Sequence, residues 1–354
     1  MKLKLRLLVL LQLIILTVYA QTDQNNLVKN QIKEEKFIQI NGIEQWITIK
    51  GDSTKPAVLF IHGGPGSPIS PYDIAFKNWE KDFVIAQWDQ RGTAKTYGRN
   101  APDELTPAYL KANPLTIEQM TFDGIAVAEY LIQHLGKQKI ILFGTSWGSI
   151  LGVEMALKKP ELFYAYIGHS QMVNPIASNV FAYQKVLQLA QNSKDMKSLN
   201  ILNEIGIPPY DLAKKSGQLM RIIKKYQQQK SIPAPAFWWE VADGYNTEKD
   251  SLNRSDGDDY SFVNFVGDKK LGITSMVSNI NFIKDGFVFK IPVYFIQGEE
   301  DIQTPAKINK KYFKQIIAPK KKFILLPKTD HGFNQSVVDT QFKIMTQIIK
   351  PQKK

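Results

Sequence analysis

The chain of 354 residues contains no cysteine and only four histidines. The absence of cysteine excludes a disulfide framework, a thiol nucleophile and a cysteine-based metal site. The sequence also lacks a phosphate-binding loop pattern, a dinucleotide-binding glycine pattern, the zinc-binding HExxH pattern and internal repeats. We therefore predict a protein that uses no cofactor and no metal ion.

Acidic residues are too few to balance the basic ones. The chain has 33 aspartates and glutamates against 45 lysines and arginines, a formal net charge of +12. A nucleic-acid-binding protein concentrates such an excess on one face, with aromatic residues interleaved. The lysines here are spread along the chain, so we predict a basic solvated surface and no nucleic-acid partner.

A long apolar run occurs only near the N-terminus. Three basic residues precede an apolar stretch that extends to about Tyr19 and ends in small residues. This order is typical of a secretory signal peptide, and the stretch is shorter than the ~20 residues that span a bilayer. We predict a signal peptide at residues 1–20, a polar leader at 21–35, export to the periplasm or the medium, and no stable membrane insertion after cleavage. An uncleaved N-terminal membrane anchor is the alternative.

Beyond the leader, short apolar strands alternate with helical patterns. Asn41-Gly42 between two short strands indicates a hairpin. Further strands are expected at residues 56–61, 82–88, 139–143, 163–167, 291–297 and 323–326, and helices at 116–135, 149–158 and 333–349. This alternation predicts an α/β fold with a mostly parallel central sheet and helices on both faces.

The alternation stops between residues 173 and 290. That stretch is polar, rich in lysine and glutamine, and largely helical in pattern. We predict that it forms a helical cap, inserted between two parts of the core at residues 36–172 and 291–354.

The sequence GTSWGS, residues 144–149, follows an expected strand and precedes an expected helix. In this context G-x-S-x-G is typical of a sharp turn that projects the serine from the sheet, with glycines where side chains would collide. The N-terminus of the following helix favours developing negative charge. We predict that Ser146 is a nucleophile.

A serine nucleophile needs a base. His331 lies between the last expected strand and the last helix, where a sheet hydrolase with the chain order serine, acid, histidine keeps its base. We therefore predict His331 as the base. Of the other histidines, His62 is expected to shape a glycine-rich loop, His134 to lie on the surface, and His169 to make a structural hydrogen bond.

The base in turn needs an acid to orient its ring. Asp301 ends a strand about thirty residues before His331 and precedes a helix start, and we predict it as this acid. Asp330 is adjacent to His331 in sequence and poorly placed to orient the ring, so it is expected to be a loop residue.

The stretch HGGPG, residues 62–66, follows a buried strand. Acyl transfer creates an oxyanion that needs preorganised donors, and loss of one typically costs ~10²–10³ in rate. One donor is expected to be the backbone N–H of Trp147, after the nucleophile, and the second to come from Gly63-Gly64. Glycine lets bare backbone approach the substrate.

Three motifs together resemble those of the proline iminopeptidases: HGGPG, WDQRG at residues 88–92, and GTSWGS. GEED at 298–301 and DHG at 330–332 fit the same pattern. The resemblance implies an α/β-hydrolase fold and a serine exopeptidase that removes an N-terminal residue, often proline, from small peptides without a metal. It also implies a triad of Ser146, Asp301 and His331, with Gly64 and Trp147 as the oxyanion hole.

The sequence departs from that family after DQRG, where members usually continue with glycine and serine and this chain reads TAKT, residues 93–96. Members bind the substrate's free ammonium through glutamates of the cap. The segment FWWE, residues 237–240, resembles the tryptophan-rich segment that carries one of them. The resemblance thus implies that Glu240 and Trp239, with Gly63, bind the substrate. Glu204 and Asp243 are weaker candidates, and an ordinary salt bridge is the alternative role for Glu240.

The expected activity is therefore that of an exported serine aminopeptidase with a small peptide substrate. A serine esterase or amide hydrolase with the same machinery and no ammonium pocket is the alternative. A non-catalytic binding protein on a hydrolase fold conflicts with the complete set of serine, acid and histidine.

Overall fold

The structure, a computed structural model, describes residues 30–350, so the predicted signal peptide and most of the leader lie outside the described residues. The strands are β1 (Gln31–Ile40), β2 (Ile43–Asp52), β3 (Ala57–Ile61), β4 (Val84–Trp88), β5 (Ile140–Thr145), β6 (Phe163–His169), β7 (Val293–Gly298) and β8 (Lys321–Leu326). The α-helices are α2 (Ala94–Asn100), α3 (Pro107–Ala112), α4 (Ile117–His134), α5 (Gly148–Lys158), α6 (Pro175–Asn192), α7 (Met196–Ile205), α8 (Ala213–Gln228), α9 (Glu248–Val266), α10 (Ala306–Gln315) and α11 (Gln335–Ile349). Segments of 3₁₀ helix are η1 (Ser70–Lys81), η2 (Pro160–Leu162) and η3 (Ala236–Trp239).

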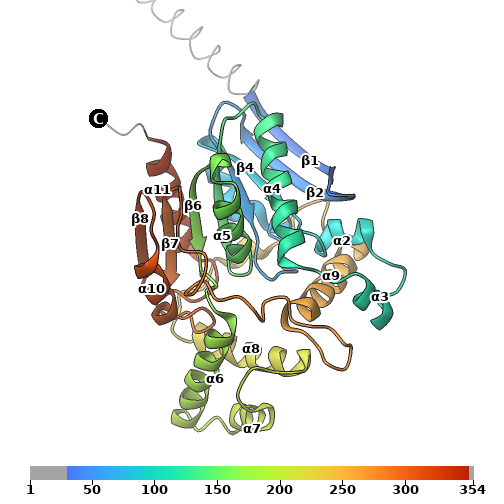
Figure 1. Cartoon of the computed structure of the whole chain (residues 1–354), viewed down its shortest axis with the longest axis vertical. Coiled ribbons are helices and arrows are strands. Elements are labelled where there is room, and N and C mark those ends of the chain that lie inside the picture. Colours follow the sequence, from blue (N-terminus) through green and yellow to red (C-terminus); the bar gives the residue numbers. More distant parts are fainter. Residues whose placement is uncertain (1–29, 351–354) are drawn as a thin grey trace, which may run out of the picture.

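The strands form one sheet in the order β1-β2-β4-β3-β5-β6-β7-β8 (Figure 1). From β4 to β8 in this order all neighbours are parallel, whereas β2 is antiparallel to both β1 and β4. The sheet confirms the predicted fold class. Its parallel strands carry their carboxyl ends, and the loops that follow them, to one edge.

Helices cover both faces of the sheet. On one face α4, α5 and α10 pack against a core that includes Trp88 and Leu142. On the other, η1 and α11 enclose a core that includes Phe60 and Phe143. All residues of β3 and β5 are buried, which explains why these central strands appear in the sequence as continuous apolar runs and not as alternating ones.

The predicted cap interval divides into two parts. Helices α6, α7 and α8 enclose a small apolar core of their own, to which Leu202 and Leu219 belong, and they lie together at one end of the sheet (Figure 1). Helix α9 instead lies beside α2 and contributes Tyr260 and Phe265 to the main core. The stretch 267–290 contains no regular helix, so the helical prediction holds for the first part of the interval and not for its end.

The hairpin forms as predicted, with positive φ angles at Asn41 (45°) and Gly42 (88°), as a tight two-residue turn requires. Strand β1 begins at Gln31, however, so the predicted leader boundary at residue 36 falls inside a strand. Gln31 pairs with Asp52. The polar composition concealed this segment because β1 is an edge strand whose first half is only partly covered.

Within residues 30–350, no helix is both long and apolar enough to cross a lipid bilayer.

Candidate active site

Ser146 lies in the turn between β5 and α5, with a φ angle of 51°. Its amide donates to the carbonyl of His169 at the end of β6, at 3.0 Å. A Cβ on Gly144 would lie 2.5 Å from the carbonyl oxygen of Gly148, and one on Gly148 would lie 2.3 Å from that of Ile61. The two flanking glycines are therefore steric requirements of this turn, which holds Ser146 at the carboxyl edge of the sheet.

The structure brings together the three residues predicted to form the triad. The Ser146 hydroxyl lies 2.8 Å from Nε2 of His331. On the other side of the ring, Nδ1 of His331 lies 3.2 Å from Oδ1 and 3.1 Å from Oδ2 of Asp301. With Nδ1–H donating to the carboxylate, the neutral ring presents Nε2 as an acceptor for the serine proton, the arrangement of a nucleophile, a base and an orienting acid.

The carboxylate of Asp301 is buried, 4% exposed, and is held by several donors. The amide of Thr304 donates to Oδ1 at 2.8 Å, and its hydroxyl donates to Oδ2 at 2.6 Å. Gln297 Nε2 also donates to Oδ2, at 3.0 Å. Burial opposes ionisation, but His331 and these donors outweigh it and lower the pKa of Asp301, so the carboxylate stays ionised.

Burial disfavours the charged form of His331, and the negative charge and hydrogen bond of Asp301 favour it. The second effect is the greater, and the pKa of His331 is raised above the ordinary value of 6.5. A stronger base results, and the imidazolium that forms when the ring takes a proton is stabilised.

Two backbone segments meet beside the Ser146 hydroxyl. The amide of Trp147 is at the start of α5, where the first N–H groups of a helix have no acceptor within it. From the loop after β3, Gly63 approaches so closely that a Cβ there would lie 3.1 Å from Cβ of Ser146. The next amide along that loop is Gly64, whose φ of 110° favours glycine. The structure thus places both predicted oxyanion segments at the nucleophile.

His62 fixes the orientation of the glycine loop. Its Nδ1 donates to the Gly63 carbonyl at 2.8 Å, and its Nε2 accepts from the Gln90 amide at 3.2 Å. Burial lowers the pKa of His62 to about 4, so this ring is neutral near pH 7. In a trans peptide the C=O and the following N–H point in opposite directions. Anchoring the Gly63 carbonyl on His62 therefore also sets the direction of the Gly64 N–H.

Gln90, in the DQRG motif after β4, connects the two segments that carry the expected donors. Its Nε2 donates to the His62 carbonyl at 2.9 Å, and its Oε1 accepts from the Trp147 indole at 2.9 Å. Thr93, one of the residues that depart from the family pattern, donates its hydroxyl to the Pro65 carbonyl at 3.1 Å. The departure thus supplies a further support for the loop.

A cavity of about 1090 Å³ opens at His331 beneath the cap. Trp239 lines it, but Glu240 does not; Glu240 is exposed at the end of η3. Two carboxylates line it, those of Asp330 beside His331 and of Asp258 on α9, and the sequence analysis did not single out Asp258. A Cβ on Gly66 would lie 2.8 Å from Oδ1 of Asp258.

Asp258 is accessible from the cavity, yet the protein around it raises its pKa, as does the neighbouring charge of Asp259, against a hydrogen bond from Ser67. The polar, charge-rich sequence of α9 reads as a solvated surface helix. Gly66 allows the close approach of Asp258, but the sequence analysis assigned the glycines of HGGPG to the oxyanion hole and gave no sign of this contact.

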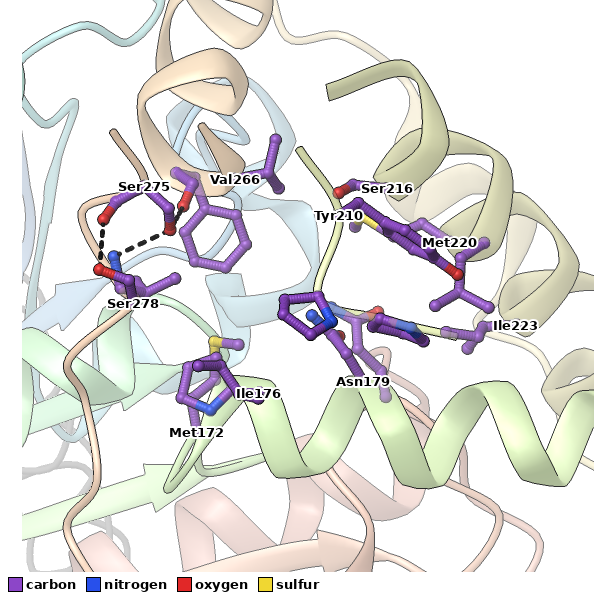
Figure 2. A pocket seen from close by; sticks show the side chains of 17 residues that line it. Met172, Ile176, Asn179, Tyr210, Ser216, Met220, Ile223, Val266, Ser275 and Ser278 are labelled. Atoms are coloured by element: carbon purple, nitrogen blue, oxygen red, sulfur yellow. Dashed lines mark hydrogen bonds between the residues drawn. The ribbon is translucent and has the colours of Figure 1, made fainter. Parts of the chain in front are cut away.

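A second, smaller cavity of about 170 Å³ adjoins the first and is mainly apolar (Figure 2). Ile176 and Asn179 line it from α6, and Met220 and Ile223 from α8. Met220 and Gln303 line both cavities and so form their common boundary.

The side chains of the remaining predicted positions make no hydrogen bond to Ser146 or to the ring of His331. His134 is on the surface beside Glu34, at 2.9 Å, and Glu204 and Asp243 are exposed outside the cavity. His169 Nδ1 lies 3.0 Å from the Thr145 hydroxyl, and its pKa is lowered to about 3 by burial and by the charge of His331. Asp330 Oδ1 accepts from the Gly332 amide at 2.9 Å within its loop.

In the part of the chain from residue 30 to 350, no group of three or more histidine and acidic side chains is arranged to hold a metal ion.

Comparison with known proteins gives one family and several relatives. A family model described as the alpha/beta hydrolase fold matches residues 56–334. A probable aminopeptidase of Bacillus subtilis, YbaC, is 29% identical over 311 residues, 86% of this chain and 92% of that protein. A proline iminopeptidase of Neisseria meningitidis serogroup B is 35% identical over 126 residues, 35% of this chain and 36% of that protein.

Solved structures are similar in fold. Proline iminopeptidase from Mycobacterium smegmatis matches with a TM-score of 0.59 at 15% identity, over 89% of this chain and 98% of that one. An epoxide hydrolase from Vigna radiata matches with a TM-score of 0.52 at 20% identity, over 90% and 98% of the two chains. The two structures are named for different reactions, so the fold alone does not determine the reaction. The side chains at the nucleophile have to be considered instead.

Proposed function

Because the chain belongs to the family of proteins with the α/β-hydrolase fold, we propose that it is a serine aminopeptidase that releases the N-terminal residue of short peptides. One observation carries the proposal: the Ser146–His331–Asp301 array lies at a cavity that also exposes the carboxylate of Asp258. The similarity to a probable aminopeptidase over most of both chains agrees with it.

In the proposed reaction His331 takes the proton of Ser146 as the serine oxygen attacks the scissile carbonyl. The amides of Gly64 and Trp147 stabilise the oxyanion. His331 then gives its proton to the leaving amine, which leaves an acyl-enzyme. Water, deprotonated by the same ring, then attacks the ester carbonyl. The bond to the Ser146 oxygen breaks, the ring returns the proton to that oxygen, and the N-terminal residue leaves with a free carboxylate.

The glycine loop gives a physical basis for recognition of a free amine. Its Gly63 contacts Ser146, and its Gly66 contacts Asp258. Three residues span at most about 11 Å, so one short loop reaches both the nucleophile and the carboxylate. In the N-terminal residue of a peptide the ammonium is only two bonds from the scissile carbonyl. An ionised Asp258, with the ring of Trp239 on the same cavity, suits that cation.

We propose proline as the favoured N-terminal residue. Its support is the set of short matches to proline iminopeptidases and the resemblance of HGGPG and DQRG to that family. The apolar cavity behind Met220 provides room for a ring or an aliphatic side chain. The same cavity suits the acyl group of an ester, so a serine esterase is the second candidate.

The test is release of amine from prolyl anilide, with N-acetyl-prolyl anilide and a small acyl ester as comparisons. We expect turnover of the free-amine substrate only, and its loss in Ser146→Ala. Asp258→Asn is expected to raise KM for prolyl anilide about 10-fold or more, since a charge-assisted contact is lost, and to leave an acyl ester little affected. Glu240→Ala, outside the cavity, is the matched carboxylate control.

Turnover of the ester with silence on prolyl anilide would assign the esterase instead. An equal effect of Asp258→Asn on both substrates would remove that residue from amine recognition. Activity in Ser146→Ala would remove the nucleophile.

We also propose export, on the strength of the N-terminal sequence pattern alone. A mature protein that begins near Gln21 is expected from mass spectrometry of the exported fraction, and intact Met1 there would oppose a cleaved signal.

A further inference from the structure

Two cationic side chains of α8 face the cavity at His331. Arg221 and Lys224 are one helical turn apart, and both line this cavity, together with the His331 of the triad. Resting on the proposed function, we infer that Arg221 and Lys224 bind a carboxylate of the peptide substrate, on the leaving-group side of the scissile bond. The chemical class of substrate is thereby narrowed to peptides that are anionic beyond their first residue.

These cations have no internal partner that would occupy them. Neither forms an ion pair with any residue between 30 and 350, whereas the adjacent Lys225 pairs with Asp195 at 2.5 Å. Both are exposed, so neither is part of the small core that α6, α7 and α8 share. A guanidinium and an ammonium that face a cavity and have no ion-pair partner among the described residues attract an anion that enters it.

The cavity carries charge of both signs, from different elements. Asp258 lies on α9 beside the glycine loop, and Arg221 and Lys224 lie on α8. The other acidic residue on the cavity, Asp330, accepts the Gly332 amide. A short peptide is itself a zwitterion: its ammonium suits Asp258, and its carboxylate suits α8. A substrate bound in the opposite sense would place like charges together and is disfavoured.

Two sources supply such a carboxylate, the free C-terminus of a short peptide and an acidic side chain. Either carboxylate would make the same contacts with Arg221 and Lys224, but the two differ in what they imply for the length of the substrate. Recognition of the C-terminus limits the length of the substrate, because the terminus must lie inside the cavity. Recognition of a side chain does not limit length.

The first arm of the test uses binding in Ser146→Ala, which does not depend on turnover. Calorimetry compares Pro-Gly-Gly with its C-terminal amide. We expect the free acid to bind about 10-fold or more tightly, the effect of a charge-assisted contact. In the triple variant that combines Ser146→Ala, Arg221→Gln and Lys224→Gln, the ratio of the two affinities, free acid over amide, should fall towards one. Lys225→Gln, whose cation already has a partner, is the matched control and should keep the ratio.

The second arm compares Pro-Glu-Gly amide with Pro-Gln-Gly amide. A preference for glutamate that needs Arg221 and Lys224 supports the inference with an acidic side chain as the source. Equal affinity in both pairs of peptides, or a preference that survives loss of both cations, would overturn it. Failure of the proposed function has a different signature: the wild type would release proline from neither prolyl anilide nor Pro-Gly-Gly, whatever the calorimetry shows.

Discussion

Asp301 accepts hydrogen bonds from Thr304, Gln297 and His331. An ionised carboxylate has about four lone-pair sites and donates nothing, so these donors match its charged form and leave no place for a proton. The residue thereby fixes the tautomer of His331 and raises its pKa. At the residue scale, the basicity of His331 therefore depends on how many hydrogen-bond donors surround the carboxylate of Asp301.

Asp301→Asn should lower kcat by roughly 10⁴ because the amide favours the wrong tautomer of the ring. The pKa of His331 is raised by the carboxylate, and activity needs the neutral ring, so activity falls as the pH drops through that pKa. Removal of the carboxylate lowers the pKa of His331, so the acid limb of the kcat/KM profile should move to lower pH. A pH profile measures this.

Asp330→Asn is the comparison, since Asp330 adds a smaller raising effect on the pKa of His331 and makes no hydrogen bond to its ring. A larger displacement of the acid limb by Asp330→Asn than by Asp301→Asn would contradict the assignment of the orienting acid.

The sequence was informative about residues whose neighbours in the chain define them. Ser146 has its glycines, and His331 and Asp301 follow strands. Asp258 had no such signal, because its place at the cavity depends on how α9 docks against a loop almost 200 residues away in sequence. Glu240 was predicted from a local resemblance, and the structure places it outside the cavity.

At the scale of elements, the loops after β3, β4 and β5 form one hydrogen-bonded unit. The DQRG loop is its middle member: Gln90 bonds to His62 in one neighbouring loop and to Trp147 at the start of α5. The spacing between the two expected oxyanion donors is therefore set by a third loop, through Gln90. Gln90 is a positioning residue.

Gln90→Leu should lower kcat by about 10- to 100-fold with little change in KM, because misplaced oxyanion donors weaken binding of the transition state and not of the ground state. Steady-state kinetics on prolyl anilide measure both constants. Gln87→Leu is a matched control: Gln87 is also buried on β4, and its Oε1 has no partner among the described residues. A similar loss in both variants would point to damaged packing.

Elements with a strong period were predicted within a few residues, such as α4 and β5. The segments η1, α2 and α3 were not predicted, because they are short, and prolines and polar residues interrupt their patterns. The stretch after α9 was expected to be helical. It is irregular instead, and buried side chains such as Val277 and Phe282 hold it against the main core.

For the whole molecule, the two parts of the cap interval are attached differently. Helices α6, α7 and α8 have their own core, whereas α9 packs on the main core through Tyr260 and Phe265 and is also bound by Lys95. The Lys95 ammonium pairs with Asp250 at 3.0 Å and lies over the rings of Trp46 and Tyr245, at 5.2 and 4.7 Å. Lys95 is one of the residues that depart from the family pattern, and this chain uses it to dock α9.

Lys95→Met should destabilise the protein by about 1–2 kcal/mol, the sum expected of a partly buried ion pair and two cation–π contacts. Urea unfolding measures it. The control is Lys215→Met: Lys215 forms an exposed pair with Asp211 at 3.9 Å, and its loss should cost less than about 0.5 kcal/mol. Equal effects would show that Lys95 contributes no more than a surface charge.

The parallel sheet was predictable from alternation along the chain, whereas the docking of α9 was not. It depends on Lys95 and Asp250, which are 155 residues apart, and on aromatic rings from two further segments. No local pattern in the sequence specifies contacts between residues so far apart in the chain.

The order of the active-site residues along the chain has a consequence for biosynthesis. Ser146 and both glycine-bearing turns are made early, but Asp301 and His331 follow β7 and β8, after the whole cap interval. A nascent chain that has emerged as far as α9 holds a nucleophile without a base. Under the proposed function, hydrolysis therefore cannot begin until translation has passed residue 331, and a product truncated before that residue is expected to be inert.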